Sequence, residues 1–356
     1  MARIFMKGNE ALGEAAVRAG IRFFAGYPIT PQSELPEYLS WRLPEVGGVF
    51  IQGESEVASI NMVYGAASTG VRAMTGSSSP GISLKSEGIS YLSSARLPAV
   101  IVNMQRGGPG LGSIQPAQMD YLQATKASGH GGFRMIVLAP HTVQEAVDIM
   151  YEAPELAERD RNPVLLLMDG CLGTMMEEVE LPPIKELPDS PCKPWTVGYD
   201  GTKRSGHMIT PIYPESGLET NNKADAARTK RWEAEDVRVE EYMVEDAEWV
   251  IVAYGISARV ARQCVNDLRE EGVKIGLIRP ITLFPFPKAA IDGLDYSRVK
   301  GVIDIEMAIP AQMREDIELQ VCRCCPVYEY GRSGGNLLDD ETTKEAIIKI
   351  MEGGAD

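Results

Sequence analysis

Short apolar runs alternate with longer segments of helical periodicity along most of this chain, and this alternation is the strongest constraint on its fold. Three of the runs, residues 99–103, 135–139 and 164–168, are almost wholly apolar and rich in branched side chains. Strands without a polar face, separated by helices, form parallel sheets that helices cover on both sides. The sequence therefore predicts an α/β fold built from doubly wound parallel sheets.

The alternation breaks between residues 182 and 246, where prolines gather first and a polar stretch follows. We expect a partly ordered inter-domain linker there. The pattern predicts one α/β domain before the linker, residues 1–181, and a second after it, residues 247–356. The strands expected in the second domain are 250–255, 273–278 and 299–305, with Ser257 as a cap of the helix after the first of them.

Four loops of the first domain follow predicted strands: residues 26–31, 52–56, 76–81 and 104–112. Open parallel sheets bind ligands outside the carboxyl ends of their strands, so we expect all four loops at one edge. Thr30 followed by Pro31 has the pattern of a helix N-cap and first helical residue, which predicts that a helix begins there. A further helix, rich in small residues, is expected from residue 56 to residue 68.

Two charged residues in these loops are candidates for chemistry. Glu56 could be a buried catalytic carboxylate, or only a charge that complements the dipole of the helix it begins. In an extended segment Glu54 points the other way, which disfavours a paired-carboxylate hydrolase. Arg106 could bind a carboxylate through its planar fork, or could be a surface arginine on a flexible loop. The glycines at 107–112 lack the G-x-G-x-x-G spacing and are a weak phosphate signal.

Composition excludes other classes of protein. The formal net charge of −15 supplies no basic patch for phosphates, so no nucleic-acid partner is expected. No run of about 18 apolar residues predicts a membrane span, and the start lacks the apolar core of a signal peptide. We therefore expect a cytoplasmic protein without a membrane partner. Cys322, Cys324 and Cys325 have no standard zinc or iron–sulfur spacing, so we interpret them as small buried strand residues rather than metal ligands.

Five blocks stand in a fixed order along the chain. They are Gly-Tyr-Pro-Ile-Thr-Pro-Gln-Ser-Glu at 26–34, Glu-Ser-Glu at 54–56, Ser-Ser-Ser-Pro-Gly at 77–81, Arg-Gly-Gly-Pro-Gly at 106–110 and Ile-Arg-Pro-Ile-Thr-Leu-Phe-Pro-Phe-Pro at 278–287. As an ordered set they resemble the α subunit of 2-oxoacid:ferredoxin oxidoreductases, closest to the 2-oxoisovalerate (branched-chain) type. The resemblance implies a thiamine diphosphate pyrimidine-binding domain followed by a transketolase C-terminal-like domain.

The resemblance also implies roles for individual residues. Glu56 matches the catalytic glutamate that contacts ring nitrogen N1′ of thiamine diphosphate. Thr30 and Arg106 match positions that bind the 2-oxo and carboxylate oxygens of the substrate. Residues 27–29, which are Tyr27, Pro28 and Ile29, would line the cofactor pocket. The implied reaction is oxidative decarboxylation of a 2-oxoacid to acyl-CoA and carbon dioxide, with coenzyme A as co-substrate and reduction of ferredoxin.

Two motifs of the family are missing from this chain. It has no Gly-Asp-Gly with a downstream Asn for diphosphate and magnesium, and no C-x-x-C-x-x-C run for a cluster. The resemblance therefore implies a β subunit that binds the diphosphate, Mg²⁺ and a [4Fe–4S] cluster, together with a γ subunit and a ferredoxin-like δ subunit. No metal ligand is expected on this chain.

Three alternatives stay open at the level of sequence. The substrate could be 2-oxoglutarate, the chain could be a non-catalytic assembly subunit with a vestigial pocket, or it could be a transketolase-like transferase without iron–sulfur partners. Residues 304–310 depart from the E-M-N-x-G-Q that relatives carry, which leaves contacts of the second domain open.

Overall fold

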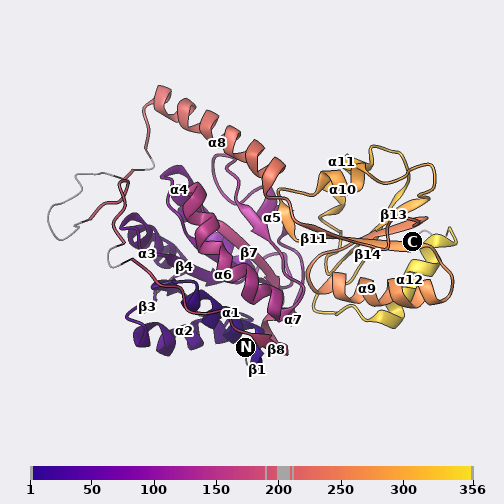
Figure 1. Ribbon diagram of the computed structural model, residues 1–356, viewed down its shortest axis with the longest axis horizontal. Helices are drawn as coiled ribbons and strands as arrows, with labels where there is room; N and C mark the ends of the chain where they lie inside the picture. Colours follow the sequence, from indigo (N-terminus) through magenta and orange to yellow (C-terminus); the bar gives the residue numbers. More distant parts are fainter. Residues whose placement is uncertain (1–2, 189–190, 199–208, 211, 354–356) are drawn as a thin grey trace.

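Two α/β domains lie side by side in the computed structural model, with the first in indigo to magenta and the second in orange to yellow (Figure 1). The structure describes residues 3–188, 191–198, 209–210 and 212–353. None of the helices in that part of the chain is long and apolar enough to span a membrane.

The sheet of the first domain has the strand order β12-β6-β7-β5-β4-β2-β3. Its strands are β2 (Phe23–Gly26), β3 (Val49–Gln52), β4 (Ala73–Ser77), β5 (Val100–Gln105), β6 (Ile136–Leu138), β7 (Val164–Asp169) and β12 (Thr282–Phe284). All neighbouring pairs are parallel except β12 with β6. The predicted parallel sheet is confirmed, and its edge strand β12 comes from the C-terminal half of the chain.

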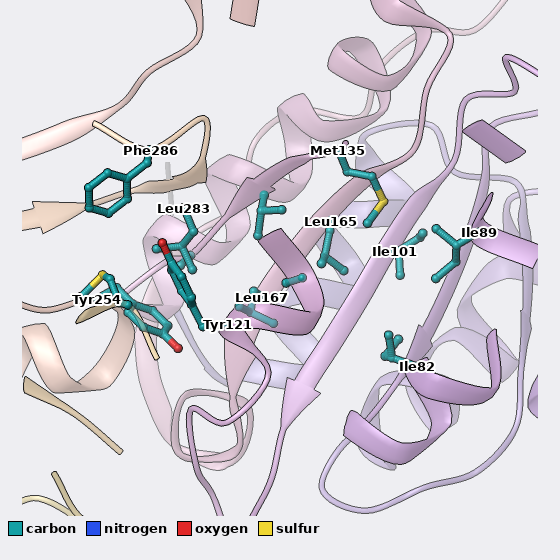
Figure 2. Packing of buried hydrophobic residues seen from close by; sticks show 14 of the residues in the cluster. Ile82, Ile89, Ile101, Tyr121, Met135, Leu165, Leu167, Tyr254, Leu283 and Phe286 are labelled. Atoms are coloured by element: carbon teal, nitrogen blue, oxygen red, sulfur yellow. The ribbon is translucent and has the colours of Figure 1, made fainter. Parts of the chain in front are cut away.

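Helices cover both faces of this sheet. They are α1 (Gly8–Arg18), α2 (Glu34–Glu45), α3 (Glu56–Ser68), α4 (Ser79–Ser94), α5 (Tyr121–Thr125), α6 (Val143–Asp160) and α7 (Gly170–Thr174). Along β5 and β7 the even-numbered apolar residues pack with α1, α2 and α6, whereas the odd-numbered ones pack with α3 and α4. Figure 2 shows the hydrophobic core on the α3 and α4 side of the sheet, which includes Ile82 and Ile89 of α4 and Ile101 of β5. The doubly wound arrangement is confirmed.

The sheet of the second domain has the order β14-β13-β10-β11-β9. Its strands are β9 (Val239–Tyr242), β10 (Trp249–Val252), β11 (Ile275–Pro280), β13 (Gly301–Glu306) and β14 (Val327–Gly331). Its helices are α9 (Gly255–Glu270), α10 (Lys288–Asp292), α11 (Arg314–Val321) and α12 (Asp340–Met351). The strands β10, β11, β13 and β14 are parallel, and β9 is antiparallel to β11. Near the N-terminus, β1 (Arg3–Lys7) pairs antiparallel with β8 (Met176–Glu180).

The segment expected to be a linker contains ordered structure. It holds helix α8 (Glu215–Glu235) as well as β9, while residues 189–190, 199–208 and 211 lie outside the described part. Helix α8 is polar, and its anchor is Trp232, which is 1% exposed and donates its indole N–H to Asp160 at 2.8 Å. One buried tryptophan gives no apolar periodicity, which is why the sequence did not reveal this helix.

Three local predictions were wrong. Helix α2 begins at Glu34 rather than at Thr30, because the chain first makes two successive turns. In these turns the Gln32 N–H donates to the Ile29 carbonyl and the Leu35 N–H donates to the Gln32 carbonyl. Ser257 lies inside α9 and donates to Gln118 of the first domain instead of capping the helix. The three clustered cysteines lie before β14 rather than on it, and Cys322 and Cys324 are exposed, because α11 ends in a left-handed turn at Cys322.

Candidate functional site

The carboxyl ends of four neighbouring parallel strands meet at one edge of the first sheet. In the order β5-β4-β2-β3 these ends are Gln105, Ser77, Gly26 and Gln52. The segments after them are joined by hydrogen bonds, such as Gly53 N to Gly26 O at 2.9 Å and Arg106 N to Ser79 Oγ at 3.0 Å. The predicted meeting of the four loops at one edge is confirmed, although Ser79 and the residues after it already belong to α4.

Glu56 is the first residue of α3, and its position follows from the local sequence. Ser55 caps the helix by accepting the Ala58 N–H at 3.1 Å. Glu56 is 6% exposed, while Glu54 is exposed to solvent. A Cβ atom placed on Gly81 of α4 would lie 2.9 Å from Glu56 Oε1. The carboxyl group is therefore held between the first turns of α3 and α4, where only glycine leaves it room.

Lys85 lies one helical turn after Gly81 and is fully buried. Its Nζ donates to Thr75 Oγ1 at 2.6 Å and to the Gly76 carbonyl at 3.2 Å, at the end of β4. Burial lowers the pKa of Lys85 to about 7, and the charge of Glu56 partly opposes this shift. Sequence reasoning missed this residue. The available signal was a lysine on the apolar face of a helix, between Ile82 and Ile89.

Arg106 is 4% exposed and has no carboxylate partner among the described residues. Its Nη1 donates to the Thr30 carbonyl and its Nη2 to the Leu111 carbonyl, each at 3.0 Å, while its Nε has no partner in the described part of the chain. The structure thus brings Thr30 and Arg106 together. Because two neutral carbonyls orient the guanidinium, its charge is available to an anionic ligand.

A buried polar network lies beneath Arg106. Asp120 Oδ2 accepts from Ser79 Oγ at 2.5 Å and from Asn103 Nδ2 at 2.9 Å, and Asn103 Oδ1 accepts from the Ser79 N–H at 3.0 Å. Burial raises the pKa of Asp120. The network fixes the end of β5 against the start of α4 and so positions Arg106. Sequence reasoning did not single out these residues, because their partners are far apart along the chain.

The predicted pocket residues 27–29 lie at the rim of the site. Tyr27 is 40% exposed, Pro28 is exposed and Ile29 is partly buried. Val57 and Leu84, next to Glu56 and Lys85 in the sequence, are also exposed apolar side chains. Exposed apolar side chains are thus found on the loop after β2 and in α3 and α4.

Several buried polar atoms at this edge have no partner among the described residues. They are Ser77 Oγ, Ser78 Oγ, Arg106 Nε and both side-chain atoms of Gln32, which lies over Gly76. Buried polar groups are normally hydrogen-bonded, so these atoms fit a polar ligand beside Glu56. In the described part of the chain no group of three or more His, Cys, Asp or Glu is arranged to hold a metal ion. The buried carboxyl group of Glu56 and these unpartnered polar atoms are groups that could hydrogen-bond to a nitrogen heterocycle.

Comparison with known proteins identifies both domains. Residues 14–246 match the family described as "Pyruvate flavodoxin/ferredoxin oxidoreductase, thiamine diP-bdg", and residues 247–342 match "Pyruvate:ferredoxin oxidoreductase core domain II". The chain is 48% identical to ketoisovalerate oxidoreductase subunit VorB of Methanothermobacter marburgensis, over 99% of this chain and 98% of that protein. It is 36% identical to 2-oxoglutarate synthase subunit KorA of Archaeoglobus fulgidus, over 98% of each chain.

Solved structures agree with these matches. The 2-oxoglutarate:ferredoxin oxidoreductase from Magnetococcus marinus, with 2-oxoglutarate, coenzyme A and succinyl-CoA bound, superposes with a TM-score of 0.85 at 26% identity. The match covers 98% of this chain and 65% of that longer chain. A split gene transketolase shares the fold, with a TM-score of 0.60 at 14% identity over 98% of both chains. The resemblance seen in the sequence is confirmed, and this chain belongs to the family of thiamine diphosphate-binding 2-oxoacid:ferredoxin oxidoreductases.

Proposed function

We propose that this chain is the pyrimidine-binding, catalytic subunit of a 2-oxoacid:ferredoxin oxidoreductase of the 2-oxoisovalerate type. The enzyme would convert a 2-oxoacid and coenzyme A to acyl-CoA and carbon dioxide and pass the electrons to ferredoxin. The observation that carries the proposal is the buried carboxyl group of Glu56, which lies at the strand edge together with the Ser77 and Ser78 hydroxyl groups, for which the described part of the chain offers no partner. The identity to VorB, higher than that to KorA, supports the branched-chain substrate.

Glu56 would hold the cofactor through N1′ of its pyrimidine ring, with Ser77 and Ser78 as further hydrogen-bonding groups. Thiamine diphosphate, when bound, supplies the carbon nucleophile and the electron sink for decarboxylation. Because Glu56 is 6% exposed, its carboxyl group can hydrogen-bond to a ring nitrogen with little competition from water. Gly81 leaves room for this carboxyl group and for the Ser77 hydroxyl, because a Cβ atom there would lie 2.9 Å from Glu56 Oε1 and 2.0 Å from Ser77 Oγ.

Arg106 and Thr30 would bind the substrate. The guanidinium of Arg106, held by two backbone carbonyls, can pair with the carboxylate of a 2-oxoacid. Thr30 is exposed, and its hydroxyl could donate to the 2-oxo oxygen. Leu111, whose carbonyl accepts from Arg106, has a side chain that is 81% exposed.

Partner subunits would complete the site. A β subunit would bind the diphosphate, Mg²⁺ and a [4Fe–4S] cluster, and γ and ferredoxin-like δ subunits would complete the complex. The exposed apolar side chains of Tyr27, Val57 and Leu84 suit burial against another polypeptide. We propose the cytoplasm as the location, because the exposed free thiols Cys322 and Cys324 suit a reducing compartment.

The test is Glu56→Gln in the assembled complex, with Glu54→Gln as the matched control two residues away on the exposed side. Glu56→Gln is expected to abolish ferredoxin or viologen reduction by 2-oxoisovalerate and to weaken thiamine diphosphate binding. Glu54→Gln should retain both properties. Near-normal turnover of the Glu56→Gln complex would refute the assignment.

The same complex separates the alternatives. A panel of 2-oxoacids ranked by kcat/KM should place 2-oxoisovalerate first, whereas a higher value for 2-oxoglutarate would transfer the assignment to the KorA type. Unchanged cofactor affinity in Glu56→Gln would favour an assembly subunit with a vestigial pocket. A purified active complex without iron would favour a transketolase-like transferase.

A further inference from the structure

The loop that follows Arg106 folds back on itself before the chain reaches the second domain. At its base Arg106 forms an antiparallel β-bridge with Pro116, and at its tip the Leu111 carbonyl accepts from Arg106 Nη2 at 3.0 Å. We call residues 106–116 the Arg106 loop. Because the tip of this loop binds the guanidinium, the orientation of Arg106 depends on how the loop is held.

Gln118, two residues beyond the Arg106 loop, is fully buried and binds the second domain. Its Nε2 donates to the Tyr254 carbonyl at 2.9 Å. Its Oε1 accepts from the Ser257 hydroxyl and from the Met307 N–H. Its own N–H donates to the Met307 carbonyl at 2.9 Å. One residue of the first domain thus bonds to three residues of the second.

These partners lie where the strand order of the second sheet reverses. The strand β10 connects through α9 to β11 on one side, whereas β13 lies on the other side of β10. Tyr254 and Met307 follow the carboxyl ends of β10 and β13, and the Tyr121 ring of the first domain packs 6.0 Å from that of Tyr254 (Figure 2). Open parallel sheets bind ligands at such a reversal. In this chain Gln118 occupies that position and joins the two domains.

A loop of the second domain also contacts the base of the Arg106 loop. A Cβ atom on Gly335 would lie 2.5 Å from Gln115 Cβ, and one on Gly107 would lie 3.8 Å from Gly334 Cα. The Gly107 N–H donates to the Gln115 carbonyl at 3.0 Å, so both contacts fall on one pair of bonded residues. The second domain therefore holds the Arg106 loop at its base as well as through Gln118.

Asp120 connects Gln118 to Arg106 within the first domain. The Asp120 carboxyl group accepts from Ser79 Oγ at 2.5 Å, and the same Ser79 oxygen accepts the Arg106 N–H at 3.0 Å. The Asp120 N–H donates to Gln105 Oε1 at 3.1 Å. The path from Gln118 to Arg106 thus consists of a short stretch of backbone and two hydrogen bonds.

We propose that Gln118 is a positioning residue for Arg106: by binding the strand ends of the second domain, it holds the Arg106 loop in the geometry that binds the carboxylate of the 2-oxoacid. The second domain then contributes to substrate binding without contacting the substrate. This role rests on the proposed function, because it assumes that Arg106 binds the 2-oxoacid.

The first experiment compares two variants of the assembled complex. Gln118→Met keeps the length of the side chain and removes its three hydrogen bonds. Glu145→Gln is the matched control, because Glu145 binds Arg279 across the domains at 3.0 Å and does not contact the Arg106 loop. Gln118→Met should raise KM for the 2-oxoacid about tenfold. The KM for coenzyme A and the Kd of thiamine diphosphate should stay at their wild-type values.

Glu145→Gln should leave the KM for the 2-oxoacid unchanged. An equal rise in both variants would show that any weakening of the contact between the domains has this effect, and it would overturn the proposal. An unchanged KM in Gln118→Met would overturn it as well.

The second experiment needs neither substrate nor cofactor. Hydrogen exchange of the full chain reports on the bonds inside the Arg106 loop, such as that from the Ser113 N–H to the Gly107 carbonyl at 2.8 Å. Gln118→Met should accelerate exchange in residues 106–116 about tenfold, and Glu145→Gln should not. Exchange at the wild-type rate in Gln118→Met would overturn the proposal.

Ser257→Ala covers the case in which Gln118→Met does not fold. It removes only the hydroxyl group of the second domain that donates to Gln118 Oε1. It should raise both the KM for the 2-oxoacid and the exchange rate of residues 106–116 about threefold. Wild-type values of both would overturn the proposal. A complex that turns over no 2-oxoacid would instead refute the proposed function, and the exchange measurement would still test the role of Gln118.

Discussion

Replacement of Lys85 by methionine should change how the stability of the chain depends on pH. Burial lowers the pKa of Lys85 from its ordinary 10.5 to about 7 in the folded chain. Between these two values the unfolded chain binds more protons than the folded chain, so the free energy of unfolding rises with pH across this window. A shift of about 3.5 pH units corresponds to about 5 kcal/mol over the whole window, or about 1.4 kcal/mol per pH unit.

Methionine matches the length of the lysine stem and does not titrate. It leaves the Gly76 carbonyl without its donor, which costs about 1–3 kcal/mol. Because this cost is the same at every pH, it does not change how the free energy of unfolding varies with pH. Urea unfolding of both proteins at about pH 7.5 and about pH 9.5 should show the wild type gaining about 3 kcal/mol relative to Lys85→Met. A difference in stability that does not vary with pH would refute the reasoning, because Lys85 would then titrate as in the unfolded chain. Lys193→Met controls for the loss of a lysine.

Three further predictions concern contacts around the site and the helix that joins the domains. Arg106→Lys should raise KM for the 2-oxoacid about tenfold or more, since lysine cannot reproduce the planar fork, and an effect confined to coenzyme A would contradict the role of Arg106. Gly81→Ala should reduce thiamine diphosphate affinity about tenfold or more, because its methyl group would overlap Ser77 Oγ and crowd Glu56. The helix control Gly65→Ala, with open space around it, should retain wild-type affinity. Asp160→Asn should destabilise the chain by about 1–3 kcal/mol in urea unfolding, because the buried carboxylate pairs with arginines beside Trp232, and unchanged stability would contradict this role.

Much of the first domain could be predicted from local sequence. Helix α3 has the bounds expected from sequence, residues 56–68, because Ser55 is a strong N-cap after a strand. The strands β5 and β7 were recognisable because both of their faces are apolar, each face packing on its own layer of helices. Once the strands were placed, their parallel order brought Thr30, Glu56 and Arg106 to one edge.

Other elements have no local signal because their stability comes from distant contacts. Helix α8 depends on buried contacts with distant residues, of Trp232 with Asp160 and of Arg228 with Asn162, and β12 is an edge strand that pairs with β6. The turn pattern around Thr30 gave the wrong helix start, because the same Thr-Pro pair also fits the turns that precede α2.

The sequence by itself determined most strands and helices of the first domain and the edge where the candidate site lies, because these depend on patterns within a few residues. Only the tertiary structure decided the electrostatics of that site. Whether a lysine is charged depends first on its burial, and Lys85 is buried against the end of β4 only after α3, α4 and the sheet have packed together.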